Sequence, residues 1–132
     1  MYELAVKTRF AAAHSLSDYI GPCARLHGHT WQVEVTFKGP DLNHTGMLLD
    51  FKEVKTKVKN IVDELDHVNL NDLDPFKKGG VENPTAENLA RYIYHRLKLE
   101  FGERERSAKV AVVRVWESPD ASASYTEDRE PV

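Results

Sequence analysis

The stretch CARLHGHTWQVEVTF, residues 23–37, places two histidines at the start of a run that alternates apolar and polar residues. In a strand, side chains at positions i and i+2 point to the same side and lie roughly 7 Å apart, so His27 and His29 can both reach one metal ion. The alternation also puts them on the apolar face, together with Trp31 and Val33. Unpaired imidazoles are costly on a core-facing side, so a ligand is expected to satisfy them.

The chain has the length and composition of one globular domain, residues 1–132. A net charge of −3 gives no basic surface for nucleic acid. No apolar run reaches the roughly 18 residues of a membrane span, and the N-terminus does not resemble a signal peptide. The single cysteine, Cys23, excludes an internal disulfide and fits the reducing cytoplasm, where we expect the protein. The charged segment 103–106 is expected to be a turn, and 126–132 an acidic tail.

Four segments have the pattern of β-strands. Residues 4–14 alternate, and their apolar set ends on His14. A second strand is expected over about 27–38, a third, rich in β-branched residues, over 108–116, and a short last one over 121–125. His14 therefore adds a third histidine in phase with the core.

Two helices are expected between the second and the third strand. Asp50 is a suitable N-cap for the first helix. Its apolar stripe consists of Phe51, Val54, Val58, Ile61, Val62 and Leu65. Thr85 is a suitable N-cap for the second helix, with Glu87 in the first turn and Gly102 at the end. This order predicts an α+β fold with an antiparallel four-stranded sheet, both helices on one face, and open edges that can pair between subunits.

The three histidines His14, His27 and His29 predict a metal site. Three neutral imidazoles with one open position are typical of catalytic Zn²⁺, whereas a structural site has a fourth protein ligand. Cys23 leaves both interpretations open. It can complete a closed site, or its thiolate can lie beside the metal and near Arg25 and act as a base or nucleophile. A third interpretation is that these are ordinary core histidines.

Two further positions carry acidic side chains suited to catalysis or binding. In Asp66-His67 a carboxylate can orient the imidazole and raise its basicity, although such a pair also occurs as a plain C-terminal helix turn. Glu117 is in phase with Val113 and Val115 and should point inward, where its two oxygens suit a heterocycle with two N–H donors. The alternative is an exposed glutamate at a strand end.

Five motifs occur in the order Phe10-Ala11-Ala12-Ala13-His14, Cys23-x-x-x-His27-Gly28-His29, Leu65-Asp66-His67-x-x-Leu70-Asn71, Asn83-Pro84-Thr85-x-Glu87-Asn88 and Trp116-Glu117. Together they resemble the 6-pyruvoyl-tetrahydropterin synthase family over about residues 8–125. The resemblance implies the tunnelling fold, in which ββααββ subunits join their sheets into a barrel. It also implies a homohexamer of two trimers with active sites between subunits.

The gap of three residues between Cys23 and His27 is similar to that of the bacterial and archaeal 6-carboxy-tetrahydropterin synthases of queuosine and deazapurine biosynthesis. The animal pyruvoyl enzymes have two more residues there, and a branch that makes a folate intermediate has Glu in place of Cys23. The resemblance therefore implies 7,8-dihydroneopterin triphosphate as substrate. It implies 6-carboxy-5,6,7,8-tetrahydropterin, acetaldehyde and triphosphate as products.

Matching positions in the family imply roles for single residues. Zn²⁺ would be held by His14, His27 and His29. Thr85 and Glu87 match positions that help to shape the pterin pocket.

The remaining matched positions imply the catalytic groups. Cys23 would be the proton-abstracting base, Asp66 and His67 its relay partners, and Glu117 the anchor of the pterin ring. Two alternatives remain. A 6-pyruvoyl-tetrahydropterin synthase would use the same substrate and similar residues, and a non-catalytic zinc-binding domain would have its site closed by Cys23.

Overall fold

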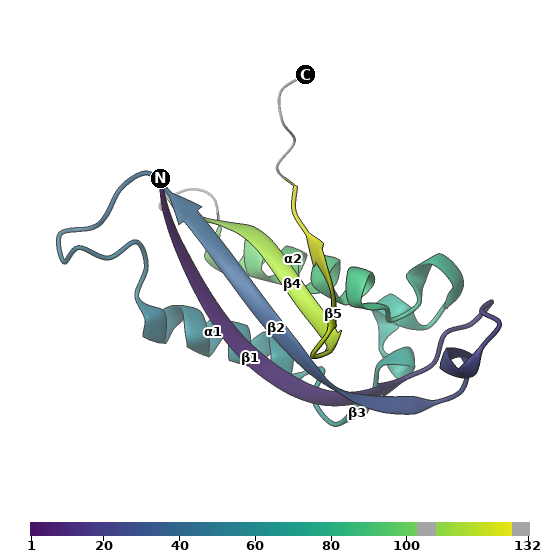
Figure 1. Cartoon of the computed structure of the whole chain (residues 1–132). Helices are drawn as coiled ribbons and strands as arrows, with labels where there is room; N and C mark the ends of the chain where they lie inside the picture. The colour runs from purple at the N-terminus through teal and green to yellow at the C-terminus, as the bar shows by residue number, and fades with distance from the viewer. Residues whose placement is uncertain (103–107, 128–132) are drawn as a thin grey trace, which may run out of the picture.

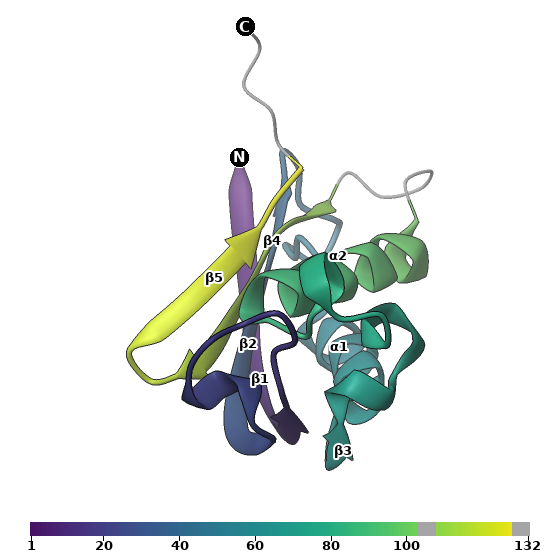
Figure 2. The same cartoon turned by 90° about the vertical axis from the view of Figure 1, so that its right-hand side faces the viewer.

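The computed structural model describes residues 1–102 and 108–127. It contains one twisted sheet with the strand order β3-β1-β2-β4-β5, and helices α1 and α2 cover one of its faces (Figure 1 and Figure 2). This confirms the expected ββααββ order for the long elements. The elements are β1 (Tyr2–His14), β2 (His27–Gly39), α1 (Phe51–Asp63), β3 (Val68–Asn69), α2 (Ala86–Phe101), β4 (Lys109–Ser118) and β5 (Ala121–Tyr125).

The register between β1 and β2 brings the predicted histidines together. The two strands pair antiparallel along their whole length, with Tyr2 opposite Gly39 and His14 opposite His27. β2 pairs antiparallel with β4, and β4 with β5. Since His29 lies two positions beyond His27 on the same face, all three imidazoles gather at one end of the sheet.

A short fifth strand corrects the expected four-stranded antiparallel sheet. β3 runs parallel to β1, with Val68 opposite Ala12. The chain reaches this edge directly after α1, where Ala11 exchanges hydrogen bonds with the backbone of His67 and the carboxylate of Asp66. A strand of two residues has no alternation to detect, so the sequence pattern could not reveal it.

The helix ends follow the expected capping. The Asp50 carboxylate accepts a hydrogen bond from the Lys52 N–H, and the Thr85 hydroxyl accepts one from the Asn88 N–H. Gly102 ends α2 with a φ of +63°, which glycine adopts without strain. Both helices therefore begin at a side-chain cap, and α2 ends at a glycine.

The apolar stripe of α1 is confirmed except at its first residue. The side chains that the core buries are Val54, Val58, Ile61, Val62 and, just after the helix, Leu65. Phe51 was expected in this stripe, but it is 55% exposed. It lies in the first turn, where a groove runs along the start of β1, and Tyr2 and Met47 line the same groove.

The remaining structural expectations concern surface segments. The expected turn at 103–106 lies outside the described residues, as do residues 128–132 of the expected tail. Within the described tail, Glu127 pairs with Lys98 at 3.1 Å. None of the helices in residues 1–102 and 108–127 is long and apolar enough to cross a membrane.

Candidate active site

Three histidine rings pack against one another at the end of β1 and β2. The centroid of the His14 ring lies 4.6 Å from that of His27 and 5.1 Å from that of His29, and the last two are 4.7 Å apart. The Nε2 atoms of all three rings are buried, and none has a hydrogen-bond partner among the residues that the structure describes. Such orphaned polar atoms are costly in a protein interior, so the cluster has the character of a metal site rather than of a packed core.

Backbone carbonyls fix the orientation of two of these rings. The Nδ1 of His14 lies 2.7 Å from the carbonyl oxygen of Pro84, and the Nδ1 of His27 lies 2.6 Å from that of Arg25. Because a carbonyl only accepts, each Nδ1 carries the proton and donates it. Each Nε2 therefore keeps its lone pair for a metal, as is usual for metal-binding histidines.

Glu117 adds a carboxylate to the histidine cluster. Its Oε1 lies 3.3 Å from the Nε2 of His29, and one ligand atom from each of His14, His27, His29 and Glu117 falls within 4.8 Å of the others. The inward direction expected from the strand alternation is confirmed. Glu117 lies where the pairing of β4 with β5 is irregular, and such bulges can redirect a side chain.

The donor set fits a divalent metal ion. Three imidazole nitrogens and one carboxylate oxygen are ligands that zinc and several transition metals accept. The sequence motifs imply only a pterin-binding role for Glu117, and the structure shows in addition that its carboxylate lies among these possible metal ligands. The signal was present in the sequence, since alternation already placed Glu117 on the face that the histidines share.

Burial keeps these imidazoles in the form that binds metal. Desolvation lowers the pKa of His14, and the hydrogen bond to the Pro84 carbonyl opposes this effect. Desolvation also lowers the pKa of His29, opposed by the nearby charge of Glu117. Both rings are therefore neutral at pH 7, with a lone pair available.

The lowered pKa values predict how the stability of the metal-free protein depends on pH. In the unfolded chain the pKa of each histidine returns to 6.5, so the unfolded state binds more protons once the pH falls below this value. The urea midpoint of the chelator-treated protein should be constant above about pH 7 and fall as the pH drops to about 5.5. The decline should be shallower in His14→Gln and unchanged in His44→Ala, because His44 is exposed. A midpoint that is flat over this range would contradict the prediction.

Cys23 lies close to the cluster in the sequence but is not part of the metal group. It occupies the 3-10 turn Pro22–Ala24, its side chain is partly buried, and its carbonyl accepts a hydrogen bond from the Leu16 N–H at 3.0 Å. Among the described residues, the group of mutually close ligand atoms contains Glu117 and not Cys23. This arrangement does not support a site that the Cys23 thiol closes as fourth ligand.

Asp66 and His67 form a close pair at the free edge of the sheet. The Nδ1 of His67 lies 2.8 Å from Asp66 Oδ2, and the Asp66 Oδ1 accepts a hydrogen bond from the Ala11 N–H at 2.8 Å. The hydrogen bond from the Ala11 N–H lowers the pKa of Asp66 most, and the hydrogen bond with His67 lowers it further. His67 has a φ of +58°, an uncommon conformation for a residue other than glycine.

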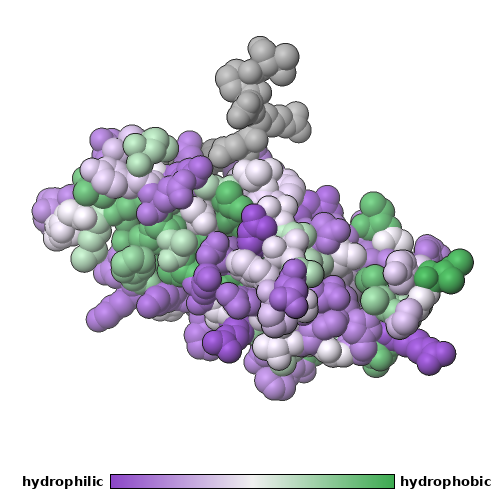
Figure 3. Space-filling view, in the orientation of Figure 1, coloured by the Kyte–Doolittle hydropathy of each residue, from purple (hydrophilic) through white to green (hydrophobic). Residues whose placement is uncertain are grey.

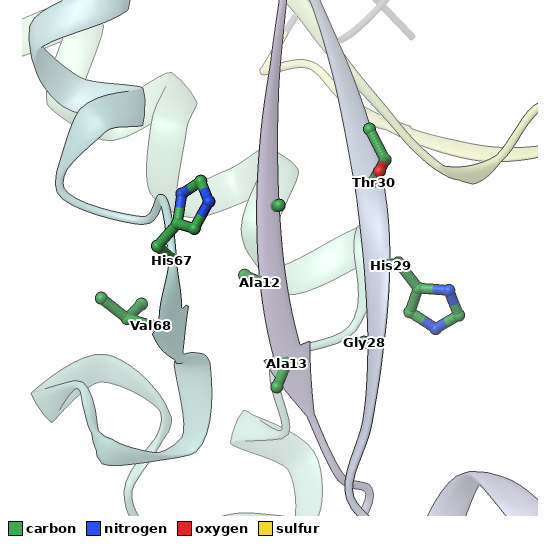
Figure 4. A pocket seen from close by; sticks show the side chains of 8 residues that line it. Ala12, Ala13, Gly28, His29, Thr30, His67 and Val68 are labelled. Atoms are coloured by element: carbon green, nitrogen blue, oxygen red, sulfur yellow. The ribbon is translucent and has the colours of Figure 1, made fainter.

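The Asp66–His67 pair is separated from the histidine cluster of the same chain. In Figure 4, His67 lies beyond β1 on the β3 side, whereas His29 projects from β2 in the opposite direction. Both residues line a shallow groove of about 560 Å³ whose floor consists of small residues such as Ala13 and Gly28. The His67 side chain is 81% exposed, so it is accessible to another molecule.

The other predicted residues lie around the start of α2 or on the surface. The Thr85 hydroxyl is occupied by the helix cap, and Glu87 is exposed in the first turn. The carbonyl of Pro84, directly before Thr85, holds His14, so this helix start adjoins the metal group. His95 is exposed on α2.

A pocket beside Glu117 contains residues that the sequence reasoning did not select. It has a volume of about 450 Å³ and is lined by Arg9, Gln32, Trp116, Glu117 and His29, among others. Arg9 lies opposite Gln32, and Gln32 opposite Trp116, so the three form a row across β1, β2 and β4. In the sequence, none of these three residues stands out from its neighbours. Only the pairing register of the strands shows that they lie side by side.

Known proteins resemble this chain in sequence and in structure. The family model for 6-pyruvoyl tetrahydropterin synthase matches residues 3–128. A Haemophilus influenzae protein named 6-carboxy-5,6,7,8-tetrahydropterin synthase is 29% identical, covering 96% of this chain and 100% of that protein. A relative of the same name from Aquifex aeolicus is 33% identical, covering 83% and 78%. The solved Caenorhabditis elegans 6-pyruvoyl tetrahydropterin synthase has a TM-score of 0.82 at 26% identity and covers 96% of each chain.

The likeness concerns the whole domain rather than one motif. The matched residues include both helices and every strand of the sheet, and the structural likeness extends over the same length. The three proteins named above are tetrahydropterin synthases, which are lyases. The chain belongs to the 6-pyruvoyl tetrahydropterin synthase family of enzymes and has its tunnelling fold.

Proposed function

We propose that this enzyme is a zinc-dependent 6-carboxy-5,6,7,8-tetrahydropterin synthase. It would convert 7,8-dihydroneopterin triphosphate and one water molecule to 6-carboxytetrahydropterin, acetaldehyde and triphosphate, in the cytoplasm and for queuosine or deazapurine biosynthesis. The observation that carries the proposal is the cluster of three buried Nε2 atoms, for which the described part of the chain offers no hydrogen-bond partner. The names of two relatives and the gap between Cys23 and His27 support the choice of product.

The metal would be held by His14, His27 and His29. A bound zinc ion would lower the pKa of the hydroxyls on the substrate side chain and stabilise negative charge on their oxygens. The protein prepares for this by donating both Nδ1 protons of His14 and His27 to carbonyls, which leaves the Nε2 atoms free.

Proton transfer is assigned to Cys23 and to the Asp66–His67 pair. Cys23 lies in the turn that leads into β2, and its thiolate would remove a carbon-bound proton from the substrate side chain. His67 would exchange a proton on the opposite side of that carbon. Asp66 orients the imidazole through the 2.8 Å contact, and its lowered pKa keeps it ionised for this task.

The pterin ring is assigned to Glu117. A carboxylate can accept two N–H bonds from the heterocycle, and the 3.3 Å contact with His29 puts this anchor next to the metal ligands. The Arg9-lined pocket beside it has room for part of the substrate. Thr85 and Glu87 would shape the site from the start of α2.

We propose that the enzyme is a homohexamer of two trimers whose sheets join into a barrel. Within the described chain, β1 has a strand partner on its β3 side only at Ala12 and Ala13, which leaves the rest of that edge open. Beside this edge lies a groove of about 680 Å³, and an apolar patch extends over this region in Figure 3. The Asp66–His67 pair, far from its own cluster, would complete the site of a neighbouring subunit.

Analysis of the reaction products tests this proposal. The zinc-loaded protein incubated with 7,8-dihydroneopterin triphosphate should release acetaldehyde and triphosphate in equal amounts, with 6-carboxytetrahydropterin identified by mass. The matched control is His44→Ala, which changes an exposed histidine and should have wild-type activity. Triphosphate release without acetaldehyde would contradict the proposal.

That contradictory result would instead identify the second candidate, a 6-pyruvoyl-tetrahydropterin synthase. The observation that favours this candidate is the likeness to the Caenorhabditis elegans structure at a TM-score of 0.82. Both activities need the same metal and the same base, so product analysis separates them directly.

A further inference from the structure

Asn71 and Asn83 belong to two of the sequence motifs but have no assigned role. Their side chains bind the backbone that follows β1. The side-chain amide of Asn71 accepts the Ser15 N–H and donates to the Ser15 carbonyl, each at 2.9 Å. Asn83 does the same with Ser17, at 3.1 Å and 2.9 Å. Each amide thus pairs with both backbone groups of one residue, as a neighbouring strand would.

The residue between the two serines connects this contact to Cys23. The Leu16 N–H donates to the Cys23 carbonyl at 3.0 Å. Alternate residues of an extended segment present their backbone groups to opposite sides. The asparagines therefore hold one side of residues 15–17, while the other side of the same segment holds the turn that carries the thiol.

Asn83 is itself held by hydrogen bonds from residues at the start of α2. Its side chain is only 7% exposed, and its carbonyl accepts hydrogen bonds from the Asn88 side chain and from the Thr85 N–H, both at 2.8 Å. A Cβ on Gly79 would lie 2.2 Å from the Ser17 hydroxyl oxygen, so the neighbouring loop packs closely on this contact. The contact is thus anchored in a helix rather than in a free loop.

We propose that Asn71 and Asn83 are positioning residues that fix the place of the Cys23 thiol. The inference rests on the proposed role of Cys23 as the catalytic base. A turn joined to the sheet only through its own chain ends samples many conformations, and a base displaced by about 1 Å loses much of its effect. The two amides restrict residues 15–17, and the Leu16–Cys23 hydrogen bond transmits this restriction to the thiol.

The test replaces each amide by a carboxylate of the same shape. Asn71→Asp and Asn83→Asp keep the acceptor oxygen, but they place a second oxygen against the serine carbonyl and lose the donated bond. Asn43→Asp is the matched control. Asn43 also accepts backbone N–H groups, from Thr45 and Met47, in the loop between β2 and α1 at the other end of the sheet (Figure 1).

Three measurements report on the position of the Cys23 thiol, and two of them do not depend on turnover. Exchange of the Leu16 amide hydrogen should be about tenfold faster in both variants. Alkylation of Cys23, the single cysteine, should be at least about threefold faster at high pH, where every thiol is ionised and the rate reports access. The kcat should fall about 10- to 100-fold while KM and zinc content stay near wild type. Asn43→Asp should change none of these.

Other outcomes would overturn the inference. Wild-type exchange and alkylation rates in both variants would show that the amides do not place the thiol, and zinc loss in step with kcat would show that they act through the histidines. If Asn83→Asp does not fold, Asn71→Asp decides, because the Asn71 side chain is only half-buried. If the wild-type protein has no synthase activity, the proposed function fails, while exchange and alkylation still decide the role of the asparagines.

Discussion

Cys23→Ala should lose about 10²- to 10⁴-fold in kcat and retain its zinc, because a catalytic base contributes about that much to a rate and the thiol is no metal ligand. Among the described residues, the group of mutually close ligand atoms consists of His14, His27, His29 and Glu117 and contains no sulfur. Zinc content measured on the purified variant, together with single-turnover rates, checks both parts of this expectation.

The same variant distinguishes a catalytic site from a closed structural one. A non-catalytic zinc-binding domain with Cys23 as fourth ligand would lose zinc on this substitution and show no turnover at all. Cys23→Ser serves as the companion variant, since its hydroxyl has nearly the same size but is a far weaker base. Equal zinc content and a rate as low as that of Cys23→Ala are expected, and wild-type turnover in either variant would remove Cys23 from the mechanism.

His14→Gln should lose both the metal and the activity. His14 is only 1% exposed, and within residues 1–102 and 108–127 its Nε2 has no hydrogen-bond partner. Loss of a group that hydrogen-bonds to a metal ligand lowers the metal affinity about 10- to 100-fold. Loss of the ligand itself should therefore lower the zinc affinity by more than about 100-fold. Titration with a competing chelator measures this change.

Two comparisons make the His14 result specific. His44→Ala changes an exposed histidine and should bind zinc as the wild type does. Thermal unfolding with and without zinc separates metal loss from misfolding, because a ligand that binds only the folded state raises the unfolding temperature. If zinc still raises the unfolding temperature of His14→Gln by the wild-type amount, the three-histidine site is wrong.

The histidine cluster could be predicted from the sequence because its determinants are local. A period of two along residues 4–14 and 27–37 decides which side chains share a face, and it placed all three histidines correctly. The same period placed Glu117 on that face. Glu117 also lies at the irregular pairing of β4 with β5, and no alternation predicts this bulge.

The parts that could not be predicted depend on contacts between distant segments. β3 is too short to show a pattern, and only its pairing with Ala12 and Ala13 of β1 makes it a strand. Phe51 fits the apolar stripe of α1 but lies beyond the part of the helix that the core buries. The motif that ends on Asn71 drew attention to this residue, yet its role is visible only through its hydrogen bonds with Ser15, 56 positions away in the chain.

The two carbonyls that orient His14 and His27 belong to the main chain, at Pro84 and Arg25. Many metal sites use a carboxylate side chain for this task, and a single substitution can remove it. A main-chain carbonyl persists whatever side chain occupies its position. The tautomers of these two ligands are thus robust to mutation, and Arg25 can change over evolutionary time without loss of this contact as long as the local backbone keeps its path.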